Sequence, residues 1–158
     1  MRIRRLLLFW FPGAALLALV CFYWLPKGLD YLEVRRFSGP VRQACEAGRD
    51  RLALSEVAPF DWDEVVILGP YVSRPWAAAA LGYPWPDYLD YRYLWGSDRY
   101  AAFLFLKESR IVRTQLHWRD HGEFSYPMRR IARDRAVFHI SRPGGRCTFA
   151  ELPLSEAG

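Results

Sequence analysis

Most of the residues and motifs that mark a catalytic or metal site are scarce or missing in this sequence. Its 158 residues include only three histidines and three cysteines. It has no His-Glu-x-x-His zinc motif, no Gly-x-Ser-x-Gly nucleophile elbow, no phosphate-binding loop and no dinucleotide fingerprint. Internal repeats and low-complexity tracts are missing too. We therefore expect no cofactor and no bound metal, and we favour a role other than catalysis.

Lysine is also rare, since the chain has 2 lysines and 20 arginines. We attribute this bias to the codon usage of a GC-rich bacterium. The net charge of +5 is unevenly distributed, and residues 107–146 alone carry +6. No helix-turn-helix or aromatic-basic RNA signature accompanies this basic region. We interpret it as a solvated arginine-rich surface and expect no nucleic-acid partner.

The longest uncharged run is Leu6–Leu25, which follows Arg2, Arg4 and Arg5. A helix of that length spans about 30 Å, which is the thickness of a bilayer's hydrocarbon core. We considered two alternatives. A cleaved signal peptide would have a shorter apolar region. A lipoprotein would need a small residue in place of Val20 before the acylated cysteine. The pattern therefore favours an uncleaved transmembrane helix that binds the lipid bilayer.

The charges on either side of this run predict its orientation. Three arginines precede it, whereas the residues after it combine Lys27 with Asp30 and Glu33. The positive-inside rule then keeps residues 1–5 in the cytoplasm, places residues 6–25 in the membrane and exports residues 26–158. In a bacterium this means a single-pass protein of the inner membrane with its globular domain in the periplasm.

The exported part is predicted to be one α+β domain. We expect a small antiparallel sheet of about four or five strands, packed on one longer and one short helix. Ser38 and Pro40 predict the start of the longer helix, and Ser73 and Gly82 bound the short one. The expected strands are 64–68, 100–106, 111–118, 135–141 and 146–151.

The segment Trp62–Tyr71, followed about 30 residues later by a Phe-rich strand, a turn and a second strand, resembles a known pattern. It is similar to a group of bacterial lipoproteins and membrane-anchored proteins that share a Trp-Asp, apolar strand, Pro-Tyr signature. The resemblance covers roughly residues 60–150. The sequence departs from it at Ser109-Arg110, where a Gly-containing turn is typical. The resemblance implies an exported domain and no particular activity.

Two features of the sequence contain candidate site residues. Four residues with metal-ligating side chains lie within seven positions of the sequence: His117, Asp120, His121 and Glu123. They would lie at a strand end and in a loop instead of on one helical face, so a solvated surface is the simpler interpretation. The alternation of the strands 111–118 and 135–141 predicts a shared exposed face. Its members would be Arg113, His117, Arg135 and His139, and it would suit an anionic partner.

The other dense feature is the aromatic segment 83–100, which includes Trp85, Tyr88 and Trp95. Its rings either fill the edge of the core or form an exposed platform. Two classes of function follow. A buried segment, with an apolar surface elsewhere, favours an interaction or scaffold domain with a protein partner in the envelope. An exposed segment favours a binding domain for an envelope glycan or lipid.

Cys45 and Cys147 are the two cysteines of the predicted exported part. Cys45 lies on the apolar stripe of its helix, and Cys147 shares a strand face with Phe149, so both sulfurs are expected to point into the same core. An oxidising periplasm would join them if their Cα atoms came within about 7 Å. Two buried free thiols are the alternative.

Overall fold

A computed structural model describes residues 25–91 and 96–152 of the chain, and side chains from residue 32 on. By its internal contacts the chain divides into two units, residues 1–33 and residues 34–158. Within the first unit the described residues form only the beginning of helix α2. Everything else described below belongs to the second unit.

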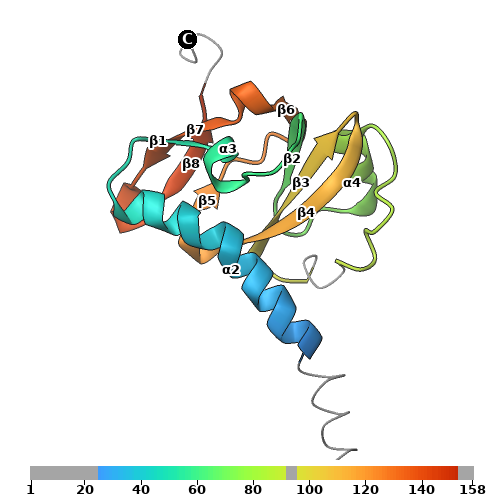
Figure 1. The fold of residues 1–158 in the computed structure, drawn as a ribbon, viewed down its shortest axis with the longest axis horizontal. Helices are drawn as coiled ribbons and strands as arrows, with labels where there is room; N and C mark the ends of the chain where they lie inside the picture. The colour runs from blue at the N-terminus through green and yellow to red at the C-terminus, as the bar shows by residue number, and fades with distance from the viewer. Residues whose placement is uncertain (1–24, 92–95, 153–158) are drawn as a thin grey trace, which may run out of the picture. The chain divides into compact units, whose positions relative to one another are not determined.

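Within the described residues the strands form two four-stranded sheets instead of the single sheet that we predicted. Figure 1 labels these strands. One sheet has the order β1-β7-β8-β5, made of β1 (Arg51–Ala53), β7 (Val137–Ser141), β8 (Thr148–Glu151) and β5 (Glu123–Phe124). The other has the order β4-β3-β2-β6, made of β4 (Arg110–Trp118), β3 (Tyr100–Lys107), β2 (Glu64–Leu68) and β6 (Arg130–Ala132). All neighbours are antiparallel except β5 and β8, which are parallel.

The helices in the described ranges are α2 (Leu25–Glu46), α3 (Leu54–Val57) and α4 (Arg74–Leu81). Three 3-10 turns in the same ranges connect strands, and they are η1 (Arg119–His121), η2 (Arg133–Arg135) and η3 (Pro143–Gly145). No helix in the described ranges is long and apolar enough to cross a bilayer. The fold-class prediction was wrong, because the strands form two sheets instead of one and none of the described helices is a transmembrane helix. The predicted span 6–25 lies outside the described residues except for Leu25.

Helix α2 differs from its prediction at the start. It begins well before Ser38 and continues through Pro40. The Ser38 hydroxyl does not cap a helix, because its Oγ accepts a hydrogen bond from the Trp118 backbone N–H at 2.9 Å. The end of the helix is conventional, since Gly48 follows it in the left-handed conformation at φ 72°.

Strict alternation along β2 and β3 builds two apolar clusters on opposite faces of the second sheet. One face, which includes Val65, Ile67 and Phe103, packs against the first sheet and α2, and we call this the sheet-to-sheet cluster. The other face, which includes Val66 and Leu104, packs against α4 and the segment that follows it, and we call this the helix-side cluster. Because both faces are covered, these strands are nearly continuous runs of apolar residues.

Candidate functional site: an aromatic groove beside helix α4

A groove of about 530 Å³ opens beside the end of β2 and the start of α4. Its volume falls within the range of small-molecule and side-chain pockets. Two segments that are distant in sequence form its walls, residues 69–76 and residues 126–128. None of the lining residues is charged; they are Gly69, Pro70, Tyr71, Val72, Ser73, Trp76, Tyr126 and Met128.

Two large aromatic rings of the groove are exposed to solvent. Tyr71 is 63% exposed and Trp76 is 65% exposed. They are two of the five exposed large apolar side chains in the described part of the chain; the other three are Leu32, Leu89 and Val112. Adjacent exposed apolar side chains that line a depression mark a binding surface more often than scattered ones do.

The opposite wall is held rigidly by the Tyr126 side chain. The ring lies on Gly69, where an added Cβ would come within 2.9 Å of the ring atom Cδ2. The Tyr126 hydroxyl donates a hydrogen bond to Glu123, whose carboxylate also accepts from Arg119 Nε at 2.7 Å. Burial, and then the hydrogen bond to Glu123, raise the pKa of Tyr126. The phenol is therefore neutral, and its ring is fixed at both ends.

Backbone strain occurs on both walls. Tyr71 has φ 60° and Met128 has φ 53°, in the left-handed region that side chains other than glycine seldom adopt. Such residues persist only where the surroundings hold them, and they concentrate at ligand-binding sites. On the first wall, the Tyr88 hydroxyl donates a hydrogen bond to the Val72 carbonyl oxygen at 3.1 Å.

Arg130 holds the second wall in place. Its Nε donates to the Leu81 carbonyl oxygen at 3.1 Å, at the end of α4. Its Nη1 lies 3.0 Å from Glu64 Oε2, at the start of β2. The strand that follows Met128 is therefore attached both to the helix and to the central strand. The groove is pre-formed because each wall is anchored to elements of the core.

The predicted aromatic platform is mostly internal. Trp85 is fully buried in the helix-side cluster and stacks on Tyr91 with ring centroids 5.2 Å apart. Tyr88 is half-buried and supports the groove through Val72. Trp95 lies outside the described residues. None of the described rings of this segment lines the groove.

The predicted exposed face of Arg113, His117, Arg135 and His139 does not form. Arg113 and His117 lie on β4, whereas His139 lies on β7 of the other sheet and Arg135 ends η2. Arg113 is exposed, with its guanidinium 4.7 Å from the Phe60 ring centroid. His117 is fully buried instead of solvated, because Phe37 of α2 and Phe124 of β5 cover it.

The burial of His117 changes its acid–base chemistry. Its Nε2–H donates to the Gly122 carbonyl oxygen at 2.8 Å, and its Nδ1 has no hydrogen-bond partner within the described ranges. Burial lowers the pKa of His117 to about 4, the hydrogen bond to Gly122 opposes this shift, and the nearby His121 adds slightly to it. The ring is neutral at pH 7. No cluster of metal-ligating side chains forms within the part of the chain that the structure describes.

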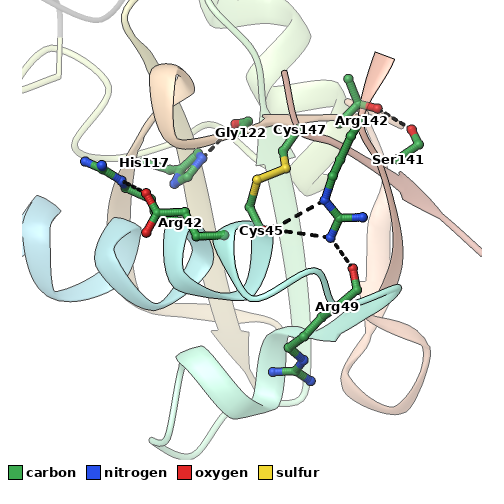
Figure 2. Close-up of a disulfide and its surroundings, with 10 residues drawn as sticks. Arg42, Cys45, Arg49, His117, Gly122, Ser141, Arg142 and Cys147 are labelled. Atoms are coloured by element: carbon green, nitrogen blue, oxygen red, sulfur yellow. Dashed lines mark hydrogen bonds and ion pairs between the residues drawn. A yellow bond between two sulfur atoms is a disulfide. The ribbon is translucent and has the colours of Figure 1, made fainter. Parts of the chain in front are cut away.

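Cys45 and Cys147 are joined by a disulfide, with Cα atoms 6.2 Å apart and a sequence separation of 102. Figure 2 shows the bond linking α2 to the residue before β8. Arg142 lies beside it and donates from Nη2 to the Arg49 carbonyl oxygen at 2.6 Å. It also reaches the Cys45 carbonyl oxygen, so it satisfies acceptors at and just beyond the end of α2.

Sequence reasoning did not identify the groove. Its only sequence signals are the Gly-Pro-Tyr at 69–71 and the Tyr-Pro-Met at 126–128, which are spaced too far apart to be linked without the fold. Comparison of the chain with protein-family models, with curated proteins and with solved structures finds no match in any of the three.

Proposed function

We propose that this protein is an interaction domain of the bacterial envelope, tethered to the inner membrane through its apolar N-terminal residues. The globular part faces the periplasm and binds a protein partner through the aromatic groove. The observation that carries this proposal is the pair of exposed rings, Tyr71 and Trp76, above an uncharged and pre-formed groove. Aromatic side chains in such positions dominate the binding energy of protein interfaces.

Two further observations support this proposal. The disulfide between Cys45 and Cys147 suits an oxidising compartment such as the periplasm. The burial of Trp85, combined with an apolar surface elsewhere, is the arrangement expected of an interaction domain. The glycan- or lipid-binding alternative depends on segment 83–100, whose described rings offer less exposed surface than the groove does.

Site-specific photo-crosslinking in intact cells tests this function. Trp76 is replaced by a photo-crosslinking amino acid, and in a matched control the same replacement is made at Val112. Val112 is 50% exposed and lies on β4, which is the edge strand opposite β6 in the same sheet. We expect a discrete crosslinked protein product from position 76 and none from position 112. Equal products from both positions, or no product from position 76, would contradict a protein-binding groove.

A further inference from the structure

The chemistry of the groove restricts what it can hold. Its lining has no charged side chain, and the Tyr126 hydroxyl already donates to Glu123. A glycan needs several fixed polar groups around its stacked ring, and a phosphate needs cations or a cluster of N–H donors. In the part of the chain that the structure describes, the unengaged polar side-chain groups of the lining are the hydroxyls of Tyr71 and Ser73 and the indole N–H of Trp76, and Tyr71 and Trp76 are exposed and held by no side-chain hydrogen bond. Sugars and phosphorylated headgroups are therefore poor fits.

The shape of the lining suits an extended proline-rich peptide. Three aromatic rings, together with Pro70 and Met128, line an open groove on the surface. Proline-rich segments in the polyproline II conformation dock against aromatic-lined grooves because their rings fill the spaces between aromatic side chains. Their conformation is already fixed before binding, so little conformational entropy is lost. Met128 adds an adaptable apolar contact.

A positive charge next to the groove also restricts the chemistry of the bound segment. Arg74 begins α4, two residues before Trp76, and it is exposed. Within the described residues its guanidinium makes no ion pair, whereas Arg129 on the other side is neutralised by Glu151 at 2.6 Å. Arg74 lies in the chain between the lining residues Ser73 and Trp76, so its unpaired positive charge is next to the groove and complements an acidic residue in a bound segment.

We propose that the partner segment is an extended, proline-rich peptide with an acidic residue beside its prolines. This inference rests on the proposed function, because it names the chemistry of the partner that the groove would bind. The prolines would lie across Tyr71 and Trp76, and the acidic side chain would meet Arg74.

Binding of synthetic peptides to the purified full-length protein in lipid nanodiscs tests this inference by calorimetry. The probes are a peptide of about ten prolines with two aspartates at one end, the same proline peptide without aspartates, and a glycine-serine peptide with the two aspartates. A disaccharide of N-acetylglucosamine and vesicles of phosphatidylethanolamine and phosphatidylglycerol probe the other ligand classes. The variants are Trp76→Ala and Arg74→Glu, with Val112→Ala as the matched exposed control.

We expect the two proline peptides to bind and the glycine-serine peptide not to bind. Trp76→Ala should weaken proline binding by at least about tenfold, which is the effect of losing one interface anchor worth 1.4 kcal/mol. Arg74→Glu should weaken only the aspartate-bearing peptide, by about threefold at low salt, because rim charges contribute modestly. Val112→Ala should change neither affinity.

Other outcomes separate this inference from the proposed function. Absence of proline-peptide binding, while crosslinking at position 76 persists, would overturn the peptide chemistry and leave the interaction function standing. Binding of the disaccharide or the vesicles that depends on Trp76, without binding of the peptides, would overturn both. Equal urea midpoints of Trp76→Ala and the parent protein will show that the variant is folded.

Discussion

The two apolar clusters of the second sheet differ in how completely they are covered. The sheet-to-sheet cluster is closed by another sheet, by α2 and by the disulfide, and it buries Trp62 and a series of phenylalanines. The helix-side cluster is covered by an eight-residue helix, by the aromatic segment after it and by Val34 of α2. Two rings, Tyr71 and Trp76, stay in solvent at its margin. The larger cluster and the disulfide therefore lie on one side of the sheet, and the groove with its two exposed rings lies at the margin of the other side.

The largest expected effect is on the closed side, where the disulfide constrains the unfolded chain. Replacing Cys45 and Cys147 together by serine should lower the free energy of unfolding by about 4 kcal/mol, because a loop of about 100 residues is no longer closed. Urea unfolding of the parent and the variant measures this difference. Adding a reductant should lower the parent to the level of the variant and leave the variant unchanged. A parent protein insensitive to reductant would show that the bond adds no stability.

A smaller effect, also on the closed side, should depend on pH. Burial lowers the pKa of His117 to about 4 from the ordinary histidine value of 6.5. The unfolded chain therefore binds a proton that the folded chain rejects. Stability is fully present above about pH 6.5 and is lost as the pH falls towards 4, by about 3 kcal/mol in total, since each pKa unit corresponds to 1.36 kcal/mol. Unfolding free energies measured between pH 7 and pH 4 test this slope.

His117→Gln is the sharpest variant for this comparison, because its amide can still donate to Gly122 while it carries no titrating group. We expect its stability to fall less steeply between pH 6.5 and pH 4 than that of the parent. His139→Gln removes an exposed histidine of the other sheet and should keep the parental slope. If His117→Gln also keeps the parental slope, the buried imidazole is not the source of the acid sensitivity.

The smallest effect is expected at the groove, where a hydrogen bond holds one wall. Tyr126→Phe removes the hydroxyl that donates to Glu123 and leaves the ion pair of Glu123 with Arg119 in place. The free energy of unfolding should fall by about 1 kcal/mol, the net value of one hydrogen bond. Tyr71→Phe, on the exposed wall, should change it by less than about 0.5 kcal/mol. Equal effects in the two variants would contradict the difference between the walls.

The long regular elements were predictable because their patterns are local. Strand β2 has the predicted bounds, Glu64–Leu68, and Ser73 and Gly82 flank α4 as expected. The division of the strands into two sheets was missed because β1 and β5 of the first sheet and β6 of the second contain only two or three residues, which is too short for a periodic pattern. Their pairing depends on distant strands and is not encoded in any short window.

The groove and the surroundings of His117 were missed for a related reason. Alternation along β4 places His117 and Arg113 on the same face, and it cannot show that other segments cover only one of them. The left-handed backbone at Tyr71 and Met128 has no sequence signal, since both are residue types that normally avoid it. For the cysteines, composition left both a bridge and free thiols open, and the approach of α2 to the residue before β8 decided between them.

The disulfide also gives the chain the topology of a covalent ring with two tails. Every residue between Cys45 and Cys147 lies inside this ring, and it includes both walls of the groove. A single proteolytic cut within the ring leaves the two pieces covalently joined. A force applied to the two ends of the chain extends only the tails, because the ring transmits the load through one sulfur–sulfur bond. The groove is thus carried on the part of the molecule that pulling cannot unravel.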